Sequence, residues 1–182
     1  MANQLVILSG PPNAGKSATA EALCQRYDRM LHIDVEVLRG FLRMGRLRPW
    51  DSSPEGRAQR ELLIASAGEM ACRFLAAGYG VIIDDVVTQD DLPVYRASLL
   101  SADAAAHFVV LLPALEVVLD RERRRPTEWN RSGRLEALHR RFSQWEGVTL
   151  LDPEELAPEL VADRVMALAA EGGALLANAP SP

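Results

Sequence analysis

One lysine in this chain stands where a compact positive charge could meet phosphate. Of the 20 basic residues, 19 are arginine and only Lys16 is lysine. It lies in residues 10–17, GPPNAGKS, which match the spacing G-x-x-x-x-G-K-[ST] of a P-loop. In such a loop, backbone N–H groups surround phosphate oxygens, the lysine reaches the β- and γ-phosphates, and the hydroxyl of Ser17 binds Mg²⁺. Arginine does not replace lysine in so tight a space, so Lys16 is expected to be chemically required.

The loop therefore predicts a site for ATP and Mg²⁺. An apolar run precedes it and a helical pattern follows it, which is the strand–loop–helix context that the motif requires. The positive N-terminal end of that helix adds to the attraction for phosphate. The residues expected to contact the nucleotide are Gly10, Pro11, Pro12, Asn13, Ala14, Gly15, Lys16, Ser17 and Ala18.

Carboxylates after the second apolar run could activate an acceptor hydroxyl. Asp34 directly follows the run 31–33, and we expect it at the carboxyl edge of the sheet, where ligands bind in open α/β folds. A carboxylate there can orient or deprotonate a hydroxyl group, so Asp34 is the expected general base. Aspartate is also a favoured helix N-cap, and the two roles are compatible. Glu36, two residues on, stays open as an alternative base.

A carboxylate pair also follows the third apolar run. Residues 81–83, Val-Ile-Ile, lead into Asp84 and Asp85, and an apolar strand that ends in acid is typical of the residue that organises Mg²⁺ in P-loop proteins. Two adjacent carboxylates repel each other unless a cation or a donor lies nearby. We expect Asp84 and Ser17 to bind the metal, and the sequence leaves the choice between Asp84 and Asp85 open. The expected substrate contacts are Asp34, Glu36, Arg39 and Asp85.

Arginines are expected to close over the transferring phosphoryl group. Eight of the 19 arginines lie between residues 121 and 141. Arg121 and Arg125 are one helical turn apart and so share a face. With Asp34 and Lys16 they are the expected catalytic residues, because cations stabilise the charge of the transition state. Residues 125–133 read as a short lid.

A parallel sheet is needed to bring these residues together. Apolar runs that read as strands begin near residues 5, 31, 81, 108 and 149, and helical patterns alternate with them. The alternation predicts an α/β protein with the three-layer P-loop NTPase fold: a five-stranded parallel sheet in the order 2-3-1-4-5, flanked by helices and completed by the short arginine-rich lid. One kinase domain is expected over residues 1–171, and residues 172–182 are expected to form a flexible C-terminal tail.

The composition and the absence of several motifs exclude some classes of P-loop protein. The net charge of −5 argues against a general affinity for nucleic acid or anionic membranes. No apolar run suits a signal peptide or a membrane span, so a cytoplasmic protein, monomeric or homodimeric, is expected. The Asn-Lys-x-Asp motif of Ras-type GTPases and the Leu-Ser-Gly-Gly-Gln signature of transporter ATPases are absent. An AAA+ machine would need a helical domain after the sheet, for which the chain is expected to be too short. Compact nucleotide and metabolite kinases remain.

The sequence resembles chloramphenicol phosphotransferase over about residues 4–100. The likeness is greatest at residues 76–86, AAGYGVIIDDV, and extends to the P-loop and to the acid after the second strand. That family phosphorylates a primary hydroxyl of the antibiotic with ATP, and the resemblance implies that Asp34 matches its proposed base. Residues 119–142 look more like the broad group of P-loop kinases that includes the kinase half of phage-type polynucleotide kinases, where the catalytic acid would fall at Glu36.

Three functions follow from these residues. The leading hypothesis is transfer of the γ-phosphate of ATP to a hydroxyl of a small molecule, such as an antibiotic of the chloramphenicol type, with Asp34 as base. The alternative is a kinase for a polynucleotide 5′-hydroxyl or a nucleotide sugar, similar to zeta toxins, with Glu36 as base. A third hypothesis, of another class, is an ATP-binding regulator with little turnover. So many carboxylates beside a polyanion argue against a pure binder.

Four arginines after Asp34 bear on the acceptor: Arg39, Arg43, Arg46 and Arg48. A neutral antibiotic would not need four cations, so they hint at an anionic acceptor or are simply solvated. A pocket beside Asp34 with apolar walls would favour a drug-like acceptor. Walls made by Arg39 and Arg43 would favour a phosphorylated or nucleic-acid acceptor.

Overall fold

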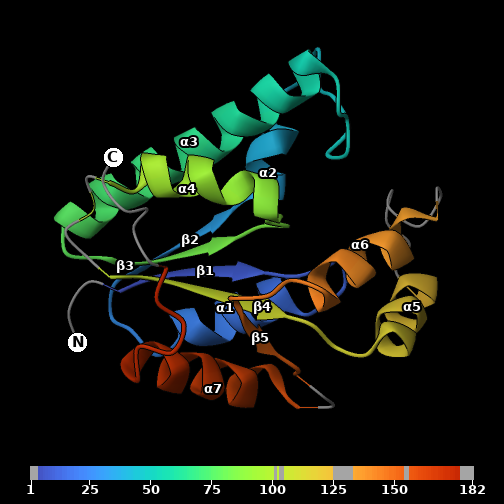
Figure 1. Ribbon diagram of the computed structural model, residues 1–182. Helices are drawn as coiled ribbons and strands as arrows, with labels where there is room; N and C mark the ends of the chain where they lie inside the picture. Colours follow the sequence, from blue (N-terminus) through green and yellow to red (C-terminus); the bar gives the residue numbers. More distant parts are fainter. Residues whose placement is uncertain (1–3, 101, 103–104, 125–132, 154–155, 177–182) are drawn as a thin grey trace.

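A parallel sheet of five strands forms the middle layer of the molecule (Figure 1). The computed structural model describes residues 4–100, 102, 105–124, 133–153 and 156–176. The strand order is β2-β3-β1-β4-β5, as predicted, and all neighbouring strands run parallel. The strands are β1 (Leu5–Ser9), β2 (Met30–Asp34), β3 (Gly80–Asp84), β4 (Ala106–Leu111) and β5 (Thr149–Leu151). Because β1 lies in the centre, the loop that follows it emerges at the middle of the carboxyl edge.

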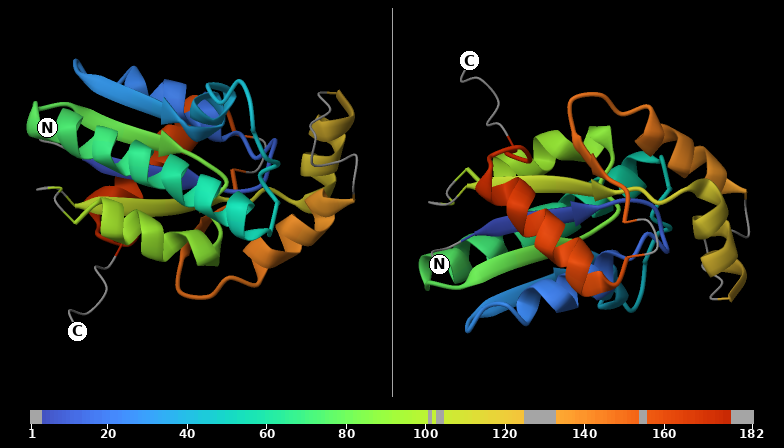
Figure 2. Two further views of the ribbon diagram at one scale, coloured as in Figure 1. Left: turned by 90° about the horizontal axis from the view of Figure 1, so that it is seen from above. Right: turned by 90° about the horizontal axis from the view of Figure 1, so that it is seen from below.

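Helices cover both faces of this sheet (Figure 2). One face carries α2 (Val35–Gly40), α3 (Pro54–Ala76) and α4 (Leu92–Ser98), and the other carries α1 (Lys16–Cys24) and α7 (Pro158–Ala170). The two faces have separate cores, and alternate residues of β1 serve them. A strand that is buried on both faces needs a continuous apolar run, which explains the sequence Leu-Val-Ile-Leu at its start.

Two further helices stand at the carboxyl end of the sheet, α5 (Leu115–Arg124) and α6 (Arg134–Ser143). Trp145 follows α6 and packs against Phe108 of β4, with 5.5 Å between the ring centroids. This contact holds the end of α6 on the sheet. A short 3-10 helix, η1 (Gln89–Asp91), precedes α4.

The segment expected as a tail contacts the sheet as far as it is described. The N–H of Phe108 donates to the carbonyl of Ala174, and the N–H of Leu176 donates to that of Ala106, both at 2.7 Å. The side chain of Ala174 is buried. These bonds satisfy backbone groups of β4 that the three-residue β5 does not reach. Residues 177–182 lie outside the described residues.

Candidate active site

The P-loop, residues 10–17, joins β1 to α1 and depends on glycine at two positions. Gly10 has a φ of 135° and Gly15 a φ of 100°, values that residues with a side chain rarely adopt. A Cβ on Gly10 would also lie 2.1 Å from the carbonyl oxygen of Leu111 in β4. The backbone can therefore curl into a phosphate-binding loop only with these glycines, as the motif predicts.

Lys16 is buried at the start of α1, and its Nζ donates to the carbonyl oxygen of Pro11 at 3.1 Å. Burial lowers the pKa of Lys16, while the negative charges of Asp84, Asp85 and Asp34 act to raise it. A bound triphosphate would add negative charge beside the ammonium group and favour its charged form. The site thus gathers carboxylates from two neighbouring strands around the chain's single lysine.

Ser17 and Asp84, the two residues expected at Mg²⁺, lie together. The hydroxyl of Ser17 donates to Oδ2 of Asp84 at 2.5 Å. Burial acts to raise the pKa of Asp84, but the imidazole of His32, with Nε2 3.7 Å from Oδ2, and the charge of Lys16 outweigh it, so the pKa is lowered. A hydroxyl and an ionised carboxylate are oxygen ligands that suit Mg²⁺ when phosphate and water complete its shell.

Asp85 points away from the loop and toward α3. Its two oxygens accept hydrogen bonds from Arg60 at 3.0 and 2.7 Å, from the hydroxyl of Tyr95 at 2.6 Å and from the N–H of Val86 at 2.8 Å. These four bonds use the four acceptor positions of a carboxylate, so none is left for the expected substrate contact. Asp84 ends β3 and Asp85 directly follows it, with its N–H still bonded to the carbonyl of Leu8 in β1. Side chains alternate along such an extended backbone, which is why Asp84 meets the P-loop and Asp85 does not.

Arg60 completes this buried network and was not singled out by the sequence. Its Nε also donates to Asp91 at 3.1 Å. Burial acts to lower the pKa of Arg60, but the charges of Asp85 and Asp91 raise it well above the ordinary value. Burial and the charge of Asp85 raise the pKa of Tyr95 as well. The network fastens α3 to the segment after β3, and so fixes the end of the strand that carries Asp84.

Asp85→Asn is expected to lower the free energy of unfolding by about 3 kcal/mol, because it breaks a buried ion pair and leaves Arg60 under-compensated. Asp84→Asn is the matched control. It is expected to cost less than about 1 kcal/mol, because its partners are a hydroxyl and groups that face the nucleotide site. Urea unfolding of both variants without nucleotide measures the difference. Equal destabilisation by the two substitutions would contradict this division of roles.

Asp34 caps the N-terminus of α2 and keeps one oxygen unused. Oδ1 accepts from the N–H groups of Glu36 at 2.9 Å and Val37 at 3.1 Å, whereas Oδ2 has no hydrogen-bond partner among the residues that the structure describes. Both carboxylate oxygens of Glu36 are engaged by Arg39, which also donates to the carbonyl of Leu47 at 3.2 Å. Each Glu36 oxygen thus already accepts one bond from a guanidinium, whereas Asp34 has one oxygen that accepts no bond from the described residues.

The helix α5 touches the P-loop at Asn13. Nη1 of Arg121 donates to the carbonyl oxygen of Asn13 at 3.1 Å, and the side-chain amide of Asn13 donates to the carboxylate of Glu122. Arg121 thus lies at the loop, where the sequence places a catalytic cation. Glu122 was missed, and the signal that could have found it is an acid in a helix end rich in arginine. Arg125 and most of the expected lid, 125–132, lie outside the described residues.

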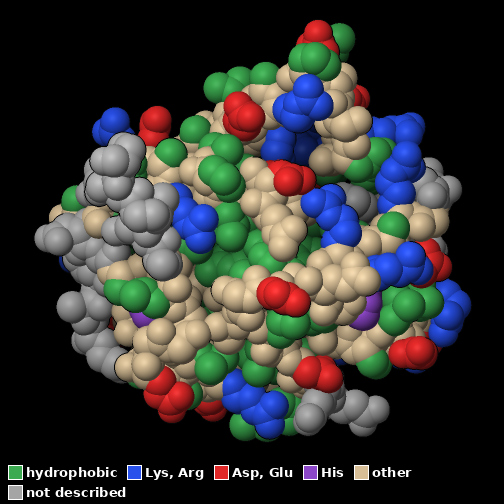
Figure 3. Space-filling view, viewed as in Figure 1, with side chains coloured by type: hydrophobic (Ala, Val, Ile, Leu, Met, Phe, Trp, Pro, Cys, Tyr) green, Lys and Arg blue, Asp and Glu red, His purple; other side chains and the backbone are tan. Residues whose placement is uncertain are grey.

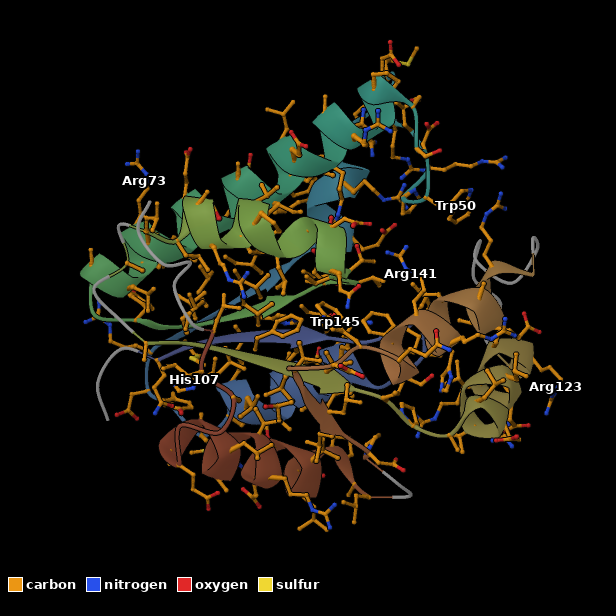
Figure 4. The ribbon with its side chains drawn as sticks, in the orientation of Figure 1. Trp50, Arg73, His107, Arg123, Arg141 and Trp145 are labelled. Carbon is orange, nitrogen blue, oxygen red and sulfur yellow. The ribbon has the colours of Figure 1, made fainter. Side chains whose placement is uncertain are left out.

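A shallow recess lies between η1 and α6. In the space-filling view, hydrophobic side chains form the floor of the hollow at the centre (Figure 3), and Arg141 and Trp145 lie beside it in Figure 4. The recess is lined by Thr88, Gln89, Leu138, Arg141, Phe142 and Trp145.

Two other features, a membrane-spanning helix and a cluster of metal-binding side chains, are absent from the described part of the chain. There, no helix is both long and apolar enough to cross a membrane. Nor do three or more His, Cys, Asp or Glu side chains gather into a metal site within those same residues. Mg²⁺ bound through phosphate, water, Ser17 and Asp84 does not need such a cluster.

The sheet order and the P-loop define a protein with the fold of the P-loop kinases. More particularly, the chain belongs to the AAA_33 family, whose model, described as an AAA domain, matches residues 5–145. The sequence argued against an AAA+ machine with a helical domain after the sheet. Among the described residues, only α7 and the segment up to Leu176 follow β5. No match was found among curated proteins.

Solved structures with this fold include several kinases. The tunicamycin resistance protein of Deinococcus radiodurans is 22% identical with a TM-score of 0.66, over 98% of this chain and 99% of that chain. The APS kinase of Mycobacterium tuberculosis, in complex with AMPPNP and APS, is 15% identical with a TM-score of 0.70, over 93% and 98%. A sugar kinase from Janibacter sp. HTCC2649 is 16% identical with a TM-score of 0.64, over 93% and 94%. Such identities show the fold, and a specific likeness to chloramphenicol phosphotransferase is not confirmed.

Proposed function

We propose that this protein is an ATP- and Mg²⁺-dependent phosphotransferase that moves the γ-phosphate to a hydroxyl group of a small molecule. The observation that carries the proposal is the unused Oδ2 of Asp34 at the same site as the buried ammonium of Lys16. The charge of Asp34 acts on the pKa of Lys16, so the carboxylate lies within electrostatic reach of the phosphate site. The sugar, APS and shikimate kinases among the structures with this fold support the same reaction class.

In the proposed reaction, Asp34 accepts the proton of the acceptor hydroxyl through its free oxygen. The acceptor oxygen then bonds to the γ-phosphorus, the bond from that phosphorus to the β–γ bridging oxygen breaks, and ADP leaves. Lys16 and Arg121 offset the negative charge that the phosphoryl oxygens carry. Ser17 and Asp84 would hold Mg²⁺, which neutralises phosphate charge when it is bound.

Exposed apolar side chains in α2 and just after it favour an acceptor with an apolar body. Val37 is 53% exposed, Phe41 69% and Met44 89%. Val37 follows Asp34 at i+3 in α2, and Phe41 is the C-cap residue of the same helix at i+7, so both lie close in sequence to the proposed base. Arg39 is buried and neutralised by Glu36, so it offers little attraction to an anionic group. These features support a small, partly apolar alcohol, such as an antibiotic of the chloramphenicol type.

The other hypotheses have less support. In a polynucleotide 5′-hydroxyl kinase or a zeta-toxin-like kinase with Glu36 as base, the Glu36 carboxylate would have to take a proton while it is paired with the guanidinium of Arg39, whose charge disfavours protonation. A regulator that only binds ATP would have no use for an unpaired carboxylate oxygen beside a polyanion, where it repels the ligand.

The test is release of ADP in the presence of Mg²⁺ and candidate acceptors: chloramphenicol, other hydroxyl-bearing antibiotics, sugars, nucleosides and oligonucleotide 5′ ends. We expect at least one small alcohol to raise ADP release above the rate in water alone and to yield a phosphorylated product by mass spectrometry. Stimulation by oligonucleotides alone would favour the polynucleotide kinase. Tight ATP binding without stimulation by any acceptor would favour the regulator.

A further inference from the structure

Glu122 is a buried carboxylate that the proposed reaction does not use. Its side chain is 0% exposed, and it lies in the last turn of α5. Burial disfavours a carboxylate unless it is paired, and the negative end of a helix dipole disfavours it further. A residue that breaks two local rules at once usually serves a contact elsewhere in the fold.

That contact is with the P-loop. The carboxylate of Glu122 accepts from Nδ2 of Asn13, and the neighbouring Arg121 donates to the backbone carbonyl of the same residue. The helix therefore holds Asn13 by its side chain and by its backbone. Among the described residues, Asn13 alone combines a side chain with a left-handed backbone, at a φ of 63°. That conformation costs an ordinary L residue roughly 1–2 kcal/mol.

The position of Asn13 in the loop makes its conformation important. Pro11 and Pro12 have no N–H group, so after Gly10 the first amide that can meet a phosphate oxygen belongs to Asn13. The N–H of Ala14 donates to the carbonyl of Pro11 at 3.2 Å, which closes a tight turn around residue 13. The direction of the following amides, up to Lys16, therefore depends on how residue 13 is held.

We infer that Glu122 is a positioning residue, which holds Asn13 left-handed so that the P-loop amides point at the triphosphate. The inference rests on the proposed function in that the ligand is MgATP. Glu122 touches neither the phosphates nor the acceptor in this scheme and acts on the loop through Asn13. Its removal should therefore weaken nucleotide binding and raise the KM for ATP, while kcat at saturating ATP stays within about twofold.

The test is a double-mutant cycle on the affinity for MgATP, measured by calorimetry. Glu122→Leu is expected to raise the Kd about tenfold, the effect of losing one hydrogen bond to a charged group. Glu122→Gln keeps an acceptor oxygen and should stay within about threefold of the wild type. Asn13→Gly adopts the left-handed conformation unaided. Adding Glu122→Leu to Asn13→Gly should therefore cause a much smaller loss than in the wild-type background, because the carboxylate then has no Asn13 side chain to hold.

Each outcome decides between the inference and its alternatives. Wild-type affinity in Glu122→Leu, or an equal loss with and without Asn13→Gly, would overturn the positioning role. If Glu122→Leu does not fold, Asn13→Ala removes the same hydrogen bond from the loop side and leaves α5 intact. It should also weaken binding about tenfold, and wild-type affinity there would overturn the inference. Failure of the wild type to bind MgATP would overturn the proposed function as well.

Discussion

Lys16→Met is expected to lower the rate of phosphoryl transfer by about 10³-fold or more, because the γ-phosphate loses its main protein cation. Lys16 is buried, and its ammonium group bonds only to the carbonyl of Pro11 in the described residues. It is thus free to turn to a phosphate without breaking an ion pair. Methionine keeps the length and volume of the side chain, so the loss should come from the charge rather than from packing. ADP release at saturating ATP measures the effect.

Lys16→Arg is the informative companion to this variant. It keeps the positive charge, but the planar guanidinium needs more room than the compact ammonium that the buried site holds. We therefore expect it to lose most of the activity too, although 19 other positions in the chain carry arginine. Unfolding temperatures close to that of the wild type would show that both proteins fold. Full turnover by Lys16→Met would refute the assignment of the P-loop as the reaction site.

Asp34→Asn is expected to lower kcat by about 10²–10⁴-fold without weakening the binding of ATP, as loss of a general base should. The substitution is well matched to the structure. Asparagine keeps the oxygen that accepts from the N–H groups of Glu36 and Val37, and it caps a helix as well as aspartate does. The fold of α2 is thereby preserved, and only the ability of the free oxygen to take a proton is lost.

Glu36→Gln is the control for the base. Its two oxygens already accept from Arg39, so its removal should change kcat by less than about tenfold through altered packing of α2. Rates with a common acceptor, together with calorimetric ATP binding, separate the two variants. A large loss in Glu36→Gln with near-normal activity in Asp34→Asn would reverse the roles and favour the polynucleotide-kinase-like alternative.

The sequence could not decide which of Asp84 and Asp85 lies at the metal site. Both follow the same apolar run, and either could have organised the metal. Successive side chains along the extended backbone point to opposite faces of the sheet, so Asp84 contacts Ser17 and Asp85 contacts Arg60. The register of β3 against β1 decides which carboxylate reaches the loop, and that register is a property of the assembled sheet.

Arg60 and Glu122 are two residues whose roles could not be predicted from the sequence. Arg60 is 25 residues from Asp85, and Glu122 is 109 residues from Asn13. No spacing rule connects such pairs, because each contact forms only when helices pack on the finished sheet. Arg125 and the lid over 125–133 remain predictions, since nearly all of that range lies outside the described residues.

The sequence by itself determined the P-loop, the alternation of strands and helices, and the order of the sheet. The P-loop and the alternation depend on local rules: glycines permit the curl of residues 10–17, and continuous apolar runs mark strands buried on both faces. The order of the sheet was predicted from the fold class that these two features indicate. Only the tertiary structure decided which acid meets which cation. In the folded chain, Oδ2 of Asp34 accepts no hydrogen bond from the described residues, Glu36 pairs with Arg39, and Glu122 accepts a hydrogen bond from Asn13. Charge pairing depends on distances in space, and those distances exist only after the layers have packed.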